Sequence, residues 1–153
     1  MPVPIDDLDR KILNLLQADA GIPLDEIARK TGSSKTPVWN RIRKMRSAGV
    51  IKKQTVIVNA QAVGLGACFF VLVRTSEHDA AWQAQFLDAL QTRAEVQEAH
   101  RLAGEIDYIL KVRVADAAAY DIFYQSLIAE VRIFNVTALL SMEEIKSTTT
   151  LAL

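Results

Sequence analysis

The order of apolar segments between residues 66 and 142 restricts the fold of this sequence more than any other feature. Four segments are typical of strands, because β-branched and aromatic residues gather in short runs, and two are typical of amphipathic helices. The predicted strands cover residues 66–75, 96–102, 106–114 and 133–142, and the predicted helices cover residues 80–90 and 117–128. The order along the chain is therefore strand, helix, strand, strand, helix, strand.

This order predicts an α+β fold of the ferredoxin-like βαββαβ type, in which the helices cover one face of a four-stranded sheet. In the first strand both faces are apolar, since Phe69 and Val71 lie opposite Phe70 and Leu72. A sheet that is apolar on both faces but covered on only one requires a partner. We therefore expect a homodimer that pairs through the uncovered face.

Charge divides the chain into two parts. The chain has 18 basic and 18 acidic residues, yet residues 34–53 contain seven basic residues and no acidic one. Residues 1–53 have eleven basic and six acidic residues, and residues 54–153 have seven and twelve. The first part is therefore expected to bind an anionic partner. We predict a DNA-binding domain over residues 1–53, a linker with a strand over 54–65, and a ligand-binding and oligomerisation domain over 66–153.

The pattern of residues 1–53 predicts three helices joined by short turns. The first starts near Asp6 and Asp7, whose charges suit a helix N-terminus, and ends at residues 19–21. The second runs from about Pro23 to Gly32. The third is the basic helix, which we expect to be capped by Thr36, to have Pro37 as its first residue, to bury Val38, Ile42 and Met45, and to end at Gly49.

Two short helices followed by a basic one are typical of a helix-turn-helix whose third helix enters the DNA major groove. The alternating residues 50–58 predict a short strand or wing beside it. Asn40 is suited to read adenine, and Arg41 or Arg43 guanine, through bidentate contacts. The predicted DNA-binding residues are Ser34, Lys35, Thr36, Trp39, Asn40, Arg41, Arg43, Lys44, Arg46, Lys52 and Lys53.

Two alternatives remain within this region. The basic residues could form an ordinary solvated helix face, although such faces usually mix acids with bases. Trp39 could contact DNA, but packing against the second helix is the favoured interpretation.

Other functions find little support in the sequence. No apolar run approaches the roughly 18 residues that span a bilayer, and the N-terminus does not resemble a secretory signal, so a cytoplasmic location is expected. The single cysteine, Cys68, excludes an internal disulfide and is expected to be a buried thiol. His78 and His100 are far apart, with no carboxylate pair at metal spacing, and His100 is expected to pack in a strand. We expect neither an enzyme, nor a metal site, nor a cofactor.

Several short motifs occur together in a fixed order: LDRKIL at 8–13, TPV at 36–38, RIRKM at 41–45, GVI at 49–51, AGEIDY at 103–108 and MEEIK at 142–146. From end to end they resemble the Lrp/AsnC (feast/famine) family of transcriptional regulators. The resemblance implies an N-terminal winged helix-turn-helix, a C-terminal regulatory (RAM, ACT-like) domain, transcription regulation through DNA binding, and a small amino-acid effector. It also implies dimers that assemble further into octamers or larger particles.

In this family the effector lies between dimers, beneath a hairpin with the pattern glycine, acid, any residue, aspartate. The resemblance therefore implies an effector site at Leu102, Ala103, Gly104, Glu105, Asp107 and Tyr108, together with Leu139, Leu140, Ser141 and Met142 from the last strand. Asp107 could neutralise the ammonium of an amino acid while amides around Gly104 hold its carboxylate. The alternative for Asp107 is a solvated carboxylate at the start of a strand.

The sequence departs from the family at residues 132–134, where many relatives have Pro-Gly, so this loop is expected to differ. Trp39, Asn40, Trp82 and residues 145–150 are most similar to the subgroup that senses cysteine. The favoured hypothesis is a sequence-specific regulator that responds to a small amino acid, for which the resemblance to this subgroup implies cysteine. The competing hypotheses are an architectural DNA-binding protein without a ligand, and an enzyme or ligand-binding module whose basic segment is incidental.

Overall fold

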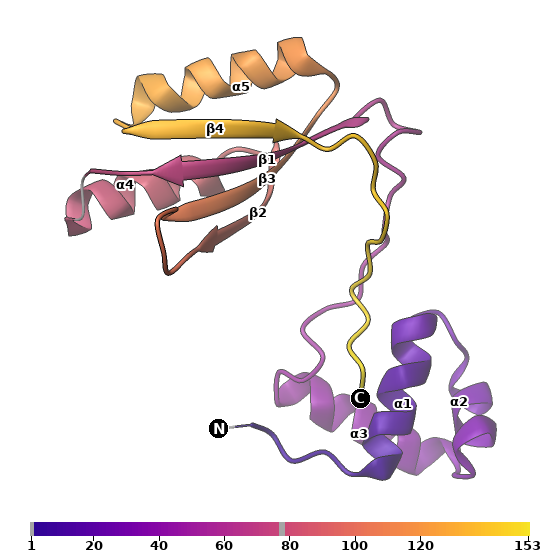
Figure 1. Cartoon of the computed structure of the whole chain (residues 1–153). Helices are drawn as coiled ribbons and strands as arrows, with labels where there is room; N and C mark the ends of the chain where they lie inside the picture. Colours follow the sequence, from indigo (N-terminus) through magenta and orange to yellow (C-terminus); the bar gives the residue numbers. More distant parts are fainter. Residues whose placement is uncertain (1, 77–78) are drawn as a thin grey trace. The chain divides into compact units, whose positions relative to one another are not determined.

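The computed structural model describes residues 2–76 and 79–153, so His78 lies outside the described residues. The chain forms two compact units (Figure 1). The first consists of Met1–Ile57 with Lys146–Leu153, and the second of Val58–Ile145. The segment Lys146–Leu153, predicted as part of the second domain, thus belongs to the first unit.

The first unit contains the three predicted helices: α1 (Asp7–Ala18), α2 (Leu24–Thr31) and α3 (Lys35–Ser47). Their inward side chains form one core of Ile12, Leu13, Ile27, Ala28, Val38 and Met45. Gly32 ends α2 with a φ of 66°, a left-handed conformation that glycine adopts without a steric cost. The sharp turn that follows leads directly into α3, which confirms the helix-turn-helix arrangement.

Helix α3 begins earlier than predicted. Ser34, not Thr36, is its N-cap residue, so Thr36 and Pro37 are the second and third residues of the helix. The backbone N–H groups in the first turn of a helix have no intrahelical acceptor. Pro37 therefore removes no helical hydrogen bond at its actual position, which is why its presence does not fix the first residue.

The strand predicted over residues 50–58 does not form in the part of the chain that the structure describes. Val50 and Ile51 form a bend after α3, residues 52–58 have no regular secondary structure, and Val56 and Ile57 are 83% and 79% exposed. Alternating sequence is compatible with a strand, but a strand requires a neighbour that accepts and donates its backbone hydrogen bonds. The segment that leads from α3 into the second unit has no such neighbour among the described residues.

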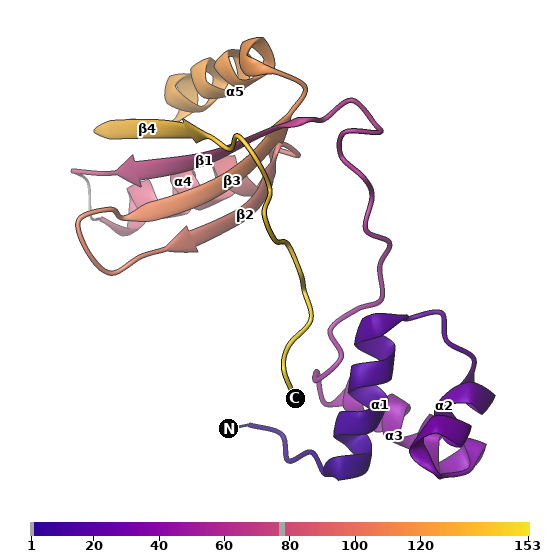
Figure 2. The same ribbon diagram turned by 45° about the vertical axis from the view of Figure 1, so that its right-hand side comes forward.

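The second unit confirms the predicted βαββαβ order. Its elements are β1 (Ala67–Arg74), α4 (Ala80–Gln91), β2 (Val96–Arg101), β3 (Tyr108–Val114), α5 (Ala117–Glu130) and β4 (Asn135–Leu140). The strands form one antiparallel sheet in the order β2-β3-β1-β4, which Figure 2 shows nearly face on. Residues of α4 and α5 share one core with alternate residues of β1 and β3, so both helices cover the same face.

The other face of the sheet is open and partly apolar. Phe70 of β1 pairs with Lys111 of β3 and Leu139 of β4, and Phe70 and Leu139 are 38% and 50% exposed.

Cys68 is buried as a free thiol, as expected. His100 does not pack: its side chain is 62% exposed, 3.6 Å from Glu98, because β2 is an edge strand and His100 lies on its open side. Among the described residues no helix is long and apolar enough to cross a membrane.

Candidate DNA interface and effector site

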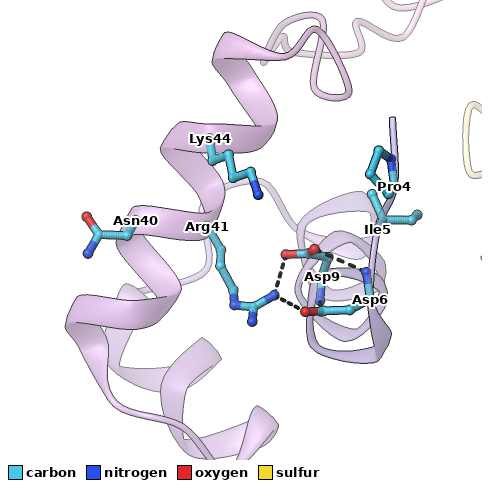
Figure 3. Close-up of a pocket in the computed structure, with 7 residues that line it drawn as sticks. All are labelled: Pro4, Ile5, Asp6, Asp9, Asn40, Arg41 and Lys44. Carbon is cyan, nitrogen blue, oxygen red and sulfur yellow. Dashed lines mark hydrogen bonds and ion pairs between the residues drawn. The ribbon is translucent and has the colours of Figure 1, made fainter. Parts of the chain in front are cut away.

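The outward face of α3 is set by the two residues that it buries. Val38 and Met45 are 0% and 4% exposed and fix the inward direction of the helix. At about 100° per residue, Asn40 and Arg43 point roughly 160° and 140° away from Val38, and both are exposed. Figure 3 shows the Asn40 side chain pointing away from α1. The two residues thus lie on the exposed face of α3, opposite the side that packs in the core.

Arg41 lies on the flank of α3, not on its outward face. Its Nη1 is 2.6 Å from Oδ2 of Asp6 and 3.0 Å from Oδ1 of Asp9, at the start of α1 (Figure 3). Two other basic residues also have partners: Lys35 pairs with Asp25 of α2, and Arg46 donates a hydrogen bond to Gln54. Residues 34–53 contain no acidic residue, but the fold brings carboxylates to them from α2 and from the start of α1.

Trp39 is 48% exposed, and the guanidinium of Arg43 lies 4.7 Å from the centre of its ring. This cation–π contact orients both side chains at the surface of α3. The aromatic residue and the candidate base-reading arginine are therefore held together, on the side of the helix that is available to a partner.

The remaining predicted residues lie at the N-terminus of α3, on its flank and beyond its end. Ser34 and Thr36 are exposed at the N-terminus of α3, where free N–H groups and the helix dipole favour a phosphate. Lys44, Lys52 and Lys53 are exposed. Lys44 also lines the hollow between α1 and α3 together with Pro4, Ile5 and Arg41. In protein–DNA complexes lysines contact phosphates more often than base edges.

The connection between β2 and β3 is longer than the three residues, 103–105, that separate the two predicted strands. It spans residues 102–107, and Asp107, which directly precedes β3, is bonded on both sides: its N–H donates to the carbonyl of Val73 in β1 over 3.0 Å. Its carbonyl accepts from the N–H of Leu102 over 2.8 Å, and its carboxylate Oδ2 accepts from the N–H of Thr75, also over 2.8 Å. Asp107 is thus an anchored, half-buried carboxylate and not a freely solvated one.

The tip of this hairpin is exposed. Leu102, Ala103, Gly104 and Glu105 are all accessible, and Gly104 has a φ of 144°, a conformation that L side chains rarely adopt. Tyr108 lies instead in the core, 6% exposed, with its ring 4.8 Å from that of Phe86. A small hollow of about 50 Å³ beside Asp107 is also lined by Asp79 and Arg101, two charged residues that are not among the predicted effector-binding residues.

The end of β4 lies far from this hairpin within one chain. Tyr108 pairs with Val73 near the end of β1, whereas Leu140 pairs with Phe69 near its start. At about 3.4 Å per residue, these positions are separated by roughly 14 Å along β1, and β3 and β4 flank opposite sides of that strand. Leu139, Leu140 and Met142 are exposed, while the N–H of Ser141 donates to the carbonyl of Cys68. One chain therefore does not bring the two predicted halves of the effector site together.

Comparisons with known proteins agree with both units. Residues 68–151 match the Lrp/AsnC ligand binding domain, and residues 5–52 match a winged helix-turn-helix DNA-binding domain. The chain is 44% identical to the glutamate uptake regulatory protein of Zymomonas mobilis over 97% of this chain and 91% of that protein. It is 36% identical to the DNA-binding transcriptional activator DecR of Escherichia coli, over 96% and 97% of the two chains.

Solved structures show the same similarity. An AsnC family transcriptional regulator from Agrobacterium tumefaciens is 40% identical with a TM-score of 0.93, over 97% of both chains. The transcriptional regulator NMB0573 from Neisseria meningitidis, solved as an L-Met complex, is 25% identical with a TM-score of 0.92, over 97% of both chains. With a DNA-binding helix-turn-helix and a matching ligand-binding domain, this chain belongs to the Lrp/AsnC family of transcriptional regulators.

Proposed function

We propose that this DNA-binding regulator responds to a small amino acid that binds between subunits of a homo-oligomer. The observation that supports it best is the separation of the two predicted halves of the effector site. The hairpin around Gly104 and the end of β4 lie at opposite ends of the sheet, so only a second subunit could place one beside the other. An effector bound there would favour one assembly over another through its different affinity for the two.

The chemistry of the hairpin suits an amino acid. Asp107 offers a carboxylate for an ammonium group, and its bonds to Val73 and Thr75 hold it in place before the ligand arrives. The exposed backbone around Gly104 offers N–H groups to a carboxylate. The L-Met complex of the Neisseria meningitidis regulator is a precedent for an amino acid on this fold. Cysteine is our first candidate, because of the resemblance to the cysteine-sensing subgroup.

For DNA, we propose that Asn40 and Arg43 read bases while Lys44, Arg46, Lys52 and Lys53 contact phosphates. The outward direction of Asn40 and Arg43 and the exposure of the four other basic side chains support this division. Dimers would form through the open face of the sheet and would assemble further, as octamers. Binding to DNA would place the protein in the cytoplasm.

The test uses the full-length protein, with thermal unfolding and sedimentation measured against the twenty amino acids at millimolar concentration. At least one amino acid should raise the melting temperature, since a ligand at 100 times its Kd stabilises by about 2.7 kcal/mol. Asp107→Asn should abolish that shift, because the amide keeps an acceptor for the Thr75 N–H but loses the charge. Asp121→Asn, on the exposed surface of α5, is the matched control and should keep the shift.

Three results would contradict the proposal: no amino acid changes either the melting temperature or the assembly, Asp107→Asn keeps the full response, or Asp121→Asn loses it. The first result, with DNA binding intact, would favour the architectural hypothesis. A shift with cysteine but not with leucine or asparagine would support the cysteine-sensing subgroup, and the opposite pattern would exclude it.

A further inference from the structure

Arg41 closes a network that joins α3 to the first turn of α1. Asp6 and Asp9 form a capping box: the N–H of Asp9 donates to Oδ1 of Asp6 over 2.9 Å, and the N–H of Asp6 donates to Oδ2 of Asp9 over 3.2 Å. The remaining oxygens, Oδ2 of Asp6 and Oδ1 of Asp9, both accept from Nη1 of Arg41. Each of the four carboxylate oxygens therefore has one donor.

This network is partly shielded from water. The side chains of Asp9 and Arg41 are 15% and 33% exposed, whereas that of Asp6 is 56% exposed. Hydrogen bonds between charged groups are strong, and shielding from solvent increases their contribution. The contact joins residues more than thirty positions apart, on the helix that starts the domain and the helix that faces DNA.

The position of Arg41 on α3 also disfavours a role in base reading. At about 100° per residue, it points only roughly 60° away from the buried Val38, whereas Asn40 and Arg43 point outward. If Arg41 turned to DNA, the carboxylates of Asp6 and Asp9 would lose their paired cation. Two unpaired carboxylates close to DNA phosphates would repel them, which is unfavourable for binding.

We propose that Arg41 is a positioning residue: it fixes α3 against the capped N-terminus of α1 so that Asn40 and Arg43 meet the bases in register. This inference rests on α3 being the helix that reads DNA. It differs from the sequence-based expectation, in which Arg41 itself was a candidate to read guanine. In the proposed arrangement Arg41 acts on DNA only through the placement of its neighbours.

The experiment is a double-mutant cycle on full-length protein, with affinity measured by fluorescence anisotropy for the DNA upstream of its own gene and for an unrelated duplex. The variants are Arg41→Ala, the pair Asp6→Asn with Asp9→Asn, and all three changes together. Asparagine caps helices about as well as aspartate, so the pair removes charge while keeping the cap. Unfolding curves identify the temperature at which every variant is fully folded.

Arg41→Ala should weaken binding to the specific DNA by roughly three- to tenfold, lower the ratio of specific to unrelated binding, and leave the salt dependence of binding unchanged. In the Asp6→Asn, Asp9→Asn background the same change should have little further effect, because the contact is already lost. If Arg41→Ala does not fold, Arg41→Met replaces it, since methionine keeps an unbranched apolar stem without the guanidinium.

A direct contact predicts the opposite results. If Arg41 binds a phosphate, its loss should reduce the slope of log K against log salt by about 1 and should persist in the Asn background. If it reads a base, discrimination should disappear at one base pair only. Either result overturns the proposal. If Lys44→Ala, like Arg41→Ala, leaves DNA affinity unchanged, the assignment of α3 as the reading helix is itself overturned.

Discussion

The side chain of Gln17 makes a pair of hydrogen bonds with the backbone of Leu151. Its Nε2 donates to the carbonyl of Leu151 over 3.0 Å, and its Oε1 accepts from the N–H over 2.7 Å. Leu151 and Leu153 line one hollow with Leu13 and Leu16 of α1. The last residues of the chain, which follow the regulatory domain in sequence, are in this way part of the DNA-binding unit.

Gln17→Ala should therefore destabilise the first unit. The loss of hydrogen bonds at this exposed site should lower its free energy of unfolding by about 0.5–1.5 kcal/mol, as measured by urea unfolding followed by circular dichroism. Asn14→Ala, on the exposed side of the same helix, is the control and should have a smaller effect. Equal effects of the two changes would show that the tail contact contributes nothing.

The stability of the first unit should depend on pH through Asp6. The hydrogen bond from Arg41, followed by that from the N–H of Asp9, lowers the pKa of Asp6 below its ordinary value of 3.8. A carboxyl whose pKa is lower in the folded state stabilises that state above its unfolded pKa, and this stabilisation is lost as the pH falls through the lowered value.

Unfolding measured between pH 7 and pH 2.5 should therefore show a decline in stability below about pH 4. Asp6→Asn should reduce this decline, because asparagine does not titrate. Asp121→Asn should leave it unchanged. An acid decline that is the same in all three proteins would contradict the role assigned to the Asp6–Arg41 pair.

A buried leucine and an exposed leucine of the second unit should lose different amounts of stability when each is replaced by alanine. Leu110, at the centre of β3, is 0% exposed, so Leu110→Ala should cost about 2–5 kcal/mol of stability through lost burial and the cavity that remains. Leu87, on α4, is 40% exposed, and Leu87→Ala should cost about 1 kcal/mol. Thermal or urea unfolding distinguishes these values, and similar losses would contradict the described core.

The open face of the sheet should control dimerisation. Phe70→Lys would add a cation beside Lys111, its partner in β3, and remove apolar surface at the centre of that face. Sedimentation should show a shift towards monomer at micromolar concentration. Ile122→Lys, at a position of α5 that is 72% exposed, should sediment like the unchanged protein. A Phe70→Lys protein with unaltered assembly would place the dimer interface elsewhere.

Two residues of α3 should affect DNA binding in distinguishable ways. Asn40→Ala should cost about 1–3 kcal/mol on the specific DNA and relax the preference at one base pair. Lys44→Ala should weaken binding to all sequences alike and reduce the salt slope by about 1. Gel shifts at several salt concentrations separate these outcomes, and Arg132→Ala, an exposed arginine of the second unit, controls for net charge.

Much of the fold follows from local patterns in the sequence. Helix and strand periods, the acidic start of α1 and the left-handed glycine at Gly32 are encoded within a few residues of one another, so the three helices and the βαββαβ order are predicted correctly. The wing strand is predicted wrongly, because the alternation of residues 50–58 cannot show whether a partner strand lies beside it. The predicted start of α3 is also wrong, because proline is tolerated at any position in the first turn of a helix and Pro37 therefore does not identify the first residue.

The sequence by itself therefore determined which residues form helices and strands, which faces are apolar, and that a basic helix is available to DNA. Only the tertiary structure decided which charges meet. Asp6 and Asp9 lie more than thirty positions before Arg41, and the Leu151 tail lies far beyond Gln17, so no local pattern predicts either contact. Charge interactions depend on distance in space, and packing of α1 against α3 is what converts a candidate base reader into a residue held by two carboxylates.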